Sequence, residues 1–346
     1  MCPDPESSNH DVSFRWDGPP PLVSVVIPVY NELNILEESI RRTRAVLDRL
    51  DAAFEIIVVD DGSTDHTFDL LFRLSRTSGE LKGIRLSRNF GKESALLAGL
   101  EAAEGDVVVT IDGDLQHPPQ LIPEMLQAWQ GGAMVVHAVK RRRDPDSWFT
   151  RMGARFFNAA LSHLSGLEMR NASDYKLLDR AAVDVISTQL TERGRFYRGL
   201  ADWIGFRQSR IPFDVEERDE GSGKWSGFAL AELAVTAVTS FTSAPLRIVT
   251  FLGVVTLAFG VVVSVEALLS WFRGDAVSGF VTIIITLLLI GSFIMISLGI
   301  IGEYIAKIYD EIKRRPVYVV ESTCGFSSGE PQGVRRRPQG DDSRST

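Results

Sequence analysis

The sequence predicts an α/β protein in which a mostly parallel sheet, covered by helices on both faces, precedes two membrane-crossing helices. The first observation is that Val- and Ile-rich runs alternate with stretches of helical spacing between residues 22 and 139. Continuous apolar runs are typical of parallel strands that are buried on both faces. The second observation is that two long stretches near the C-terminus carry almost no charge.

The apolar runs and the helical stretches follow one another in a regular order. The expected strands are LVSVVIP, FEIIVVD, KGIRLS, DVVVTID and AMVVHAV. The helices expected between them occupy residues 32–50, 65–75, 92–103 and 118–130. A more polar region follows, with helices expected at residues 148–165, 181–190 and 196–204, and with strands expected at SDYKLLD and RQSRIPFDVEE.

The C-terminal part has the features of a membrane anchor. An apolar-rich stretch with few charges, residues 226–245, is expected to lie along a membrane surface. Residues 246–270 and 278–302 each exceed the roughly 20 residues that cross a bilayer, and the short loop between them makes them a hairpin. The positive residues that flank this hairpin predict that both chain ends are cytoplasmic: Arg247, Lys307, Lys313, Arg314 and Arg315.

The expected domain organisation follows from these segments. It consists of a disordered tail at residues 1–20, a cytoplasmic domain at 21–225, the surface helix at 226–245, transmembrane helices at 246–270 and 278–302, a juxtamembrane helix and strand at 303–320, and a disordered tail at 321–346.

Composition excludes several classes of protein. The 346 residues carry a formal net charge of −8 without a field of Lys and Arg, which argues against nucleic acid as a partner. Cys2 and Cys324 lie in polar tails and form neither a disulfide framework nor a metal site, which fits a reducing compartment. The N-terminal stretch lacks the basic and apolar regions of a signal peptide.

Polar clusters follow four of the expected strands. In chain order they are PVYNE, DDGSTD, SRNFGK and DGDLQ. Ligands of parallel α/β sheets bind outside the carboxyl ends of the strands. We therefore expect the four clusters to form one site, which includes Lys92 and Gly113.

Asp112 and Asp114 stand two positions apart, just past an expected strand. Carboxylates this close repel each other unless a cation lies between them. Mg²⁺ or Mn²⁺ is the natural occupant, because these ions prefer oxygen ligands and bridge carboxylates to substrate phosphates. Capping of the next helix is the alternative, but the polar ends of the other strands favour the metal. His117 precedes a proline pair and is interpreted as part of a helix start rather than as a third ligand.

Asp60 and Asp61 follow the second expected strand and can accept hydrogen bonds from a base or from ribose hydroxyls. Capping of the following helix is their alternative role. The sequence has no GxGxxG after the first strand and no P-loop motif. The expected ligand is therefore a pyrophosphate whose charge is neutralised by a metal.

Four stretches, SVVIPVYNE, IIVVDDGSTD, SRNFGKESALLAGLEAAEGD and TIDGDLQHPPQLIPEM, resemble the family 2 glycosyltransferases of the GT-A fold. The resemblance covers residues 21–320 and narrows to the polyprenyl-phosphate glycosyltransferases, namely dolichol-phosphate mannose synthases and bactoprenol (undecaprenyl-phosphate) glucosyltransferases. SDYKLLDR, ERGRFYRGLADWIGFRQ and GSGKW are most similar to the bactoprenol branch. The resemblance implies a Rossmann-like GT-A sheet with a C-terminal two-helix transmembrane hairpin.

The resemblance also assigns roles within the strand-end clusters. It implies that Asp112 and Asp114 hold Mg²⁺ or Mn²⁺ on the diphosphate of a nucleotide sugar, with Gln116 next to the metal. The residues that match nucleotide-binding positions of the family are Pro28, Tyr30, Glu32 and Asp60. Asp174 lies where inverting relatives have their proposed catalytic aspartate, and it is expected either to act as a base or to orient the sugar.

The acceptor that the resemblance implies is a lipid monophosphate, whose anionic oxygen can attack the anomeric carbon without a strong base. Four cationic residues are expected to bind this phosphate near the membrane: Arg195, Arg198, Arg218 and Lys224. For any one of them alone, a solvated basic face is the alternative. By resemblance, the expected reaction is an inverting transfer of a hexose, with UDP-glucose as first choice, to undecaprenyl phosphate at the inner (plasma) membrane for cell-envelope glycosylation.

The alternatives are a dolichol-phosphate-mannose-type synthase using GDP-mannose, a family 2 transferase with a non-lipid acceptor, a processive polysaccharide synthase, and a non-enzymatic protein with a degenerate site. A processive synthase normally has more spans and a QxxRW motif. Intact Asp60, Asp112, Asp114 and Lys224 argue against a degenerate site. Close relatives suggest a homo-tetramer, and a flippase and a second glycosyltransferase are expected to act downstream.

Overall fold

The computed structural model describes residues 19–140, 172–190, 192, 197–213, 244–273 and 279–326. These residues belong to two compact units. The first comprises residues 1–147, 168–223 and 316–346, and it contains the sheet. The second comprises residues 148–167 and 224–315, and it contains two long helices.

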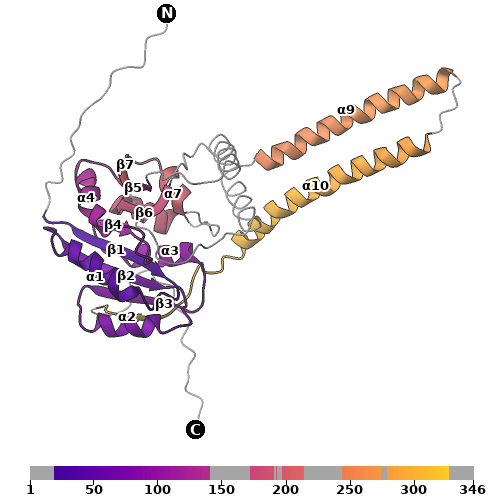
Figure 1. Cartoon of the computed structure of the whole chain (residues 1–346). Coiled ribbons are helices and arrows are strands. Elements are labelled where there is room, and N and C mark those ends of the chain that lie inside the picture. Colours follow the sequence, from indigo (N-terminus) through magenta and orange to yellow (C-terminus); the bar gives the residue numbers. More distant parts are fainter. Residues whose placement is uncertain are drawn as a thin grey trace, which may run out of the picture. The chain divides into compact units, whose positions relative to one another are not determined.

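An eight-stranded sheet forms the centre of the first unit (Figure 1). Its strands are β1 (Leu22–Val29), β2 (Ala53–Asp60), β3 (Leu81–Leu86), β4 (Val107–Thr110), β5 (Val135–Lys140), β6 (Ala172–Asp179), β7 (Gln208–Phe213) and β8 (Val320–Cys324). Their order across the sheet is β7-β5-β6-β4-β1-β2-β3-β8. In this described part of the chain, β6 and β8 run antiparallel to their neighbours, and the other strands share one direction. The expected mostly parallel sheet is confirmed.

Helices cover both faces of this sheet. They are α1 (Leu36–Leu47), α2 (Thr67–Ser75), α3 (Lys92–Ala102), the short η1 (Pro119–Leu121), α4 (Ile122–Gln130), α6 (Arg180–Asp184), η2 (Val185–Gln189) and α7 (Tyr197–Trp203). One core lies beneath α1, α2 and α4, and the other lies beneath α3, α6 and α7.

Alternation of side chains along each strand explains why the strands read as continuous apolar runs. Val25 and Val58 belong to the first core, whereas Val26 and Val59, one residue further along, belong to the second. Helix α3 packs especially close to the sheet, because a Cβ on Gly99 would collide with the Val26 side chain. This close packing fixes the position of Lys92, the first residue of α3.

The C-terminal strand β8 corrects the expected domain boundary at residue 321. It pairs antiparallel with β3 at the edge of the sheet, and the buried Cys324 is part of the core rather than of a polar tail. Arg85 Nε on β3 lies 3.1 Å from Glu321 Oε2 on β8. The five residues of β8 are weakly apolar, so the sequence analysis ended its expected strand at residue 320, where β8 begins.

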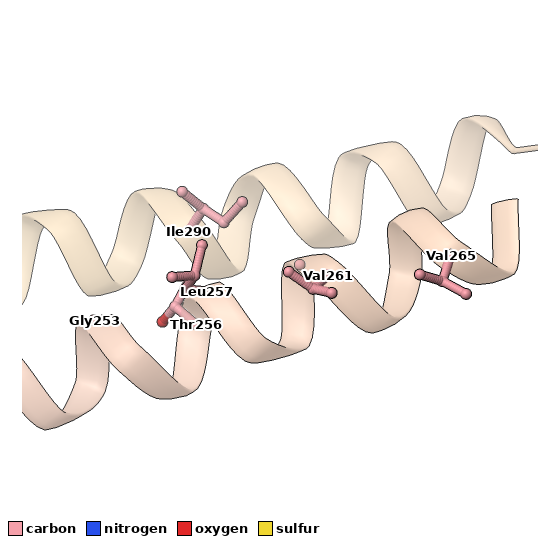
Figure 2. A pocket seen from close by; sticks show the side chains of 7 residues that line it. Gly253, Thr256, Leu257, Val261, Val265 and Ile290 are labelled. Carbon is pink, nitrogen blue, oxygen red and sulfur yellow. The ribbon is translucent and has the colours of Figure 1, made fainter. Parts of the chain in front are cut away.

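The second unit contains α9 (Ala244–Arg273) and α10 (Phe280–Ile312), which contact each other. Within α10, Leu289–Ile312 is long and apolar enough to cross a bilayer, with a mean hydropathy of 1.9; α9 contains a shorter apolar stretch, Val249–Val263. Figure 2 shows an open, apolar groove lined by α9 residues and by Ile290 of α10. The helix expected at residues 148–165 and most of the surface helix expected at 226–245 lie outside the described residues.

A buried ionic cluster joins β1, β2 and β3 near the amino-terminal end of β2. Glu55 accepts hydrogen bonds from Ser24 Oγ at 2.5 Å and from the Glu104 backbone N–H at 2.8 Å. Lys82 Nζ lies 2.7 Å from the other Glu55 oxygen, and both side chains are largely buried. Because the cluster is far along the strands from their carboxyl ends, its role is structural.

Replacement of the buried carboxylate tests this structural role. We expect Glu55→Gln to lower the free energy of unfolding by about 2 kcal/mol, because Lys82 loses its close counter-ion. Nucleotide affinity should stay unchanged below the melting temperature. The matched control is Glu38→Gln, which weakens solvent-accessible pairs with Arg41 and Arg42 and should lower the melting temperature far less. Loss of nucleotide binding by Glu55→Gln at an unchanged melting temperature would contradict this assignment.

Candidate active site

The carboxyl ends of β1, β2, β3 and β4 meet at one edge of the sheet, because these strands are parallel neighbours. The loops that leave this edge are bonded to one another. The Asn31 backbone N–H donates to Ser63 Oγ at 2.9 Å, and Asn31 Oδ1 accepts from the Thr64 N–H at 2.8 Å. Tyr30 is 43% exposed at this edge, which leaves its ring accessible to a planar ligand.

Asp60 and Asp61 are both buried at the end of β2. Asp60 Oδ1 accepts from the Ser63 N–H at 2.9 Å, and Arg85 Nε lies 3.9 Å from Asp60 Oδ2. Burial raises the pKa of the Asp60 carboxyl, against the lowering effects of Ser63 and Arg85.

Asp61 holds the loop that precedes α3. Its two oxygens accept from the backbone N–H groups of Phe90 and Gly91, each at 2.8 Å. Burial is also the main cause that raises the pKa of Asp61. Gly62 has a φ of 70° and lies against the backbone of Arg88, so a side chain there would meet both strain and collision. These contacts give Asp61 a loop-positioning role, and its contact with a nucleotide stays a prediction.

Lys92 links two carboxylates at the centre of the edge. Its Nζ lies 2.5 Å from Asp112 Oδ1 and 2.6 Å from Asp174 Oδ2. Burial lowers the pKa of Lys92, but the charges of Asp112 and Asp174 outweigh this effect and raise it overall. The lysine is therefore a fixed positive charge between two aspartates.

Asp174 reaches this edge because β6 runs antiparallel to β4. Thr110, at the end of β4, pairs with Lys176, so the amino-terminal part of β6 lies beside the carboxyl end of β4. Asp174 is only 5% exposed. The structure thus brings together three residues that the sequence analysis assigned to the site: Lys92, Asp112 and Asp174.

Asp112, Asp114 and His117 each offer one ligand atom, and these atoms all lie within 4.8 Å of one another. Two carboxylates and an imidazole suit Mn²⁺, and the carboxylates suit Mg²⁺, so the side chains present fit a divalent ion. His117 Nδ1 lies 3.4 Å from Asp112 Oδ2, and its ring packs against the rings of Tyr175 and Phe213.

The sequence analysis weighed His117 as a third ligand and preferred a helix start, whereas the structure places its ring within reach of both aspartates. Leu115 has a φ of 62°, a left-handed conformation that turns the chain back after the two aspartates. No residue type marked this turn, because a left-handed leucine is uncommon. Asp114 Oδ1 accepts from the Gln116 backbone N–H at 3.1 Å, and metal ligation by the Gln116 side chain stays a prediction.

The structure describes some of the remaining expected site residues but not all of them. Pro28 is buried within β1, and Glu32 follows it in the loop, where its backbone N–H donates to Thr67 Oγ1 at 3.2 Å. A Cβ on Gly113 would lie 2.8 Å from Val29 Cγ1, so the chain passes close to β1 there. Arg198 belongs to α7, whereas Arg195, Arg218 and Lys224 lie outside the described residues.

The mixed α/β sheet, with carboxylates gathered at the ends of its parallel strands, agrees with the GT-A fold expected from the sequence. The chain matches the description "Glycosyl transferase family 2" over residues 24–186. It is 38% identical over 306 residues to an uncharacterized glycosyltransferase of Synechocystis sp., covering 88% of this chain and 96% of that protein. The chain belongs to glycosyl transferase family 2.

Other relatives in the family have more specific names. A prophage bactoprenol glucosyl transferase homolog of Escherichia coli is 33% identical over 301 residues, covering 86% of this chain and 98% of that protein. A bactoprenol glucosyl transferase of Shigella phage SfV is 32% identical over 305 residues, covering 87% of this chain and 98% of that protein. The resemblance to the bactoprenol branch is thereby confirmed.

Solved structures with a similar fold are more distant. Glucosyl-3-phosphoglycerate synthase from Mycobacterium tuberculosis, in complex with uridine diphosphate, has a TM-score of 0.44 and 24% identity, covering 63% of this chain and 79% of that one. A mannosyltransferase from Pyrobaculum calidifontis, in complex with GDP-Man and Mn²⁺, has a TM-score of 0.44 and 17% identity. The match covers 81% of this chain and 87% of that one.

Direct titration with Mn²⁺ tests the proposed ligands. We expect Asp114→Asn to weaken Mn²⁺ binding at least about tenfold, because a charged ligand is replaced by a neutral one. The measurement is the amplitude of the electron paramagnetic resonance signal of free Mn²⁺. His117→Asn should also weaken binding if the imidazole is a ligand, and unchanged affinity would remove it from the set. Asp51→Asn, on an exposed loop, is the control.

Proposed function

We propose that this protein is a membrane-bound, metal-dependent, inverting glycosyltransferase that moves a hexose from a nucleotide sugar to a polyprenyl phosphate. UDP-glucose is the proposed donor, and undecaprenyl phosphate is the proposed acceptor. The observation that carries the proposal is the cluster of Lys92, Asp112 and Asp174, in which Asp112 is also one of the residues that could hold a metal ion. The lipid acceptor is supported by the relatives named bactoprenol glucosyl transferases and by the apolar stretch of α10.

The donor would lie across the strand-end edge. In this proposal Tyr30, which is exposed at the edge, and Asp60 would contact the base and ribose, and Asp112 and Asp114 would hold Mg²⁺ or Mn²⁺ on the diphosphate. When bound, such an ion neutralises charge that develops on the leaving nucleoside diphosphate. Lys92 supplies a second fixed positive charge within contact of Asp112.

The transfer is a single displacement. An oxygen of the acceptor phosphate forms a bond with the anomeric carbon while the bond from that carbon to the diphosphate oxygen breaks. The phosphate oxygen is already anionic, so it needs no strong base. Asp174 is paired with Lys92 at 2.6 Å, and this pairing favours a role in orienting the sugar hydroxyls over a role in removing a proton.

The membrane arrangement is part of the same proposal. Helices α9 and α10 would cross the inner membrane as a hairpin, with the sheet-containing unit and both chain ends in the cytoplasm. Arg195, Arg198, Arg218 and Lys224 would bind the lipid phosphate where it leaves the bilayer surface.

Transfer to lipid is measured directly with purified protein in detergent, undecaprenyl phosphate and a panel of radiolabelled nucleotide sugars. We expect one sugar, glucose from UDP-glucose, to enter the organic phase in the presence of Mn²⁺ or Mg²⁺. EDTA and Asp114→Ala should abolish this transfer. Transfer of mannose from GDP-mannose would indicate a synthase of the dolichol-phosphate-mannose type. Consumption of donor without a lipid-linked product would reject the lipid acceptor.

Asp174→Asn separates donor binding from the transfer step. We expect kcat to fall about 100-fold, because the amide cannot pair with Lys92 or hold the sugar hydroxyls as the carboxylate does. Affinity for the nucleoside diphosphate, measured by calorimetry, should change less than about twofold, since the residue lies on β6 and away from Asp60. An unchanged kcat would exclude Asp174 from the reaction.

A further inference from the structure

Helix α7 is short, yet it is tied to the elements that carry the active site by contacts at both of its ends. At its start, the Tyr197 backbone N–H donates to Glu93 Oε2 at 2.9 Å, and Glu93 directly follows Lys92 on α3. Near its end, Asp202 Oδ1 lies 3.2 Å from His137 Nε2 on β5. These contacts hold α7 against α3 and the sheet.

The third contact of α7 is a chain of hydroxyl groups. Thr110 Oγ1 donates to the Asp174 carbonyl oxygen at 2.6 Å, and the Tyr197 hydroxyl lies 3.0 Å from the same Thr110 oxygen. A threonine hydroxyl has one proton, and a carbonyl oxygen can only accept. Thr110 therefore donates its hydroxyl proton to the Asp174 carbonyl oxygen, and Tyr197 must be the donor in the hydrogen bond to Thr110.

The surroundings keep the tyrosine in this donor state. Tyr197 is only 3% exposed. Burial raises the pKa of the Tyr197 phenol, so it is protonated at neutral pH. The two hydrogen bonds therefore donate in one direction, from Tyr197 to Thr110 and from Thr110 to the backbone carbonyl of Asp174.

We infer that Tyr197 is a positioning residue that fixes the acceptor-binding helix relative to the aspartate that orients the sugar. The inference rests on the proposed function, in which Arg198, the next residue of α7, binds the acceptor phosphate. The phenol of Tyr197 ties α7 to the backbone of Asp174 through Thr110, and its own N–H ties α7 to the residue that follows Lys92. Attack on the anomeric carbon needs the phosphate and the sugar in one fixed relation.

The test compares Tyr197→Phe with Tyr318→Phe. Tyr318 is the matched control, because it is 1% exposed and its hydroxyl donates to Glu101 at the other end of α3. We expect Tyr197→Phe to raise the KM for undecaprenyl phosphate about five- to tenfold, the effect of losing one buried hydrogen bond. The KM for the nucleotide sugar should change less than about twofold. Tyr318→Phe should leave both KM values unchanged, even if its melting temperature falls equally.

Variants of Thr110 test the middle of this series of hydrogen bonds. Thr110→Val should reproduce the effect of Tyr197→Phe, and the double variant should be no worse than Thr110→Val alone, because both changes break the same connection. Thr110→Ser keeps the hydroxyl and should restore the wild-type KM. Additive effects in the double variant would contradict a shared chain.

Hydrogen exchange of the α7 backbone supplies a readout that does not depend on the acceptor. Amides of residues 197–203 should exchange faster in Tyr197→Phe than in the wild type or in Tyr318→Phe. Unchanged exchange would overturn the inference. If the wild type transfers no sugar to undecaprenyl phosphate, the proposed function fails, and faster exchange would still show that Tyr197 holds α7.

Discussion

The concentration of negative charge at one edge of the sheet is the constraint on which the site depends. Asp60, Asp61, Asp112, Asp114 and Asp174 all lie where strands end or begin. They are held in two ways: Asp60, Asp61 and Asp114 accept from backbone N–H groups, and Asp112 and Asp174 pair with the ammonium of Lys92. Among the described residues, the pairing with Lys92 places two of these carboxylates around a single positive charge. A lysine at the start of α3 therefore organises the centre of the edge.

Much of the fold could be predicted from the sequence because burial on both faces leaves a clear pattern. Runs such as LVSVVIP and FEIIVVD became β1 and β2, and polar clusters after them marked the edge at which the site lies. The spacing of Asp112 and Asp114 carried enough chemistry to predict a divalent ion, and the structure adds His117 to the possible ligands. These features depend on neighbours in the sequence, which a pattern can record.

What could not be predicted depends on pairing between distant segments. Asp174 meets Lys92 only because β6 inserts antiparallel between β4 and β5, and the sequence of β6 does not state its neighbours or its direction. Thr110 and Tyr197 were likewise overlooked, because a threonine inside an apolar run and a tyrosine in a short helix are ordinary core residues. Their significance comes from a hydrogen bond between positions 87 residues apart. Apart from the boundary at residue 321, which β8 corrects, the domain boundaries remain expectations from the sequence, as do the roles of Arg195, Arg218 and Lys224.

The C-terminal strand β8 has a consequence for how the chain is made. Because β8 lies beyond α10 in the chain, the ribosome must complete both long helices before the sheet can receive its last strand. Until then β3 is an open edge, with unpaired backbone groups beside a growing polypeptide. The nascent sheet therefore needs protection during synthesis, and any C-terminal truncation that removes residues 320–324 makes this temporary exposure permanent. A fusion tag attached after residue 326 leaves the strand intact.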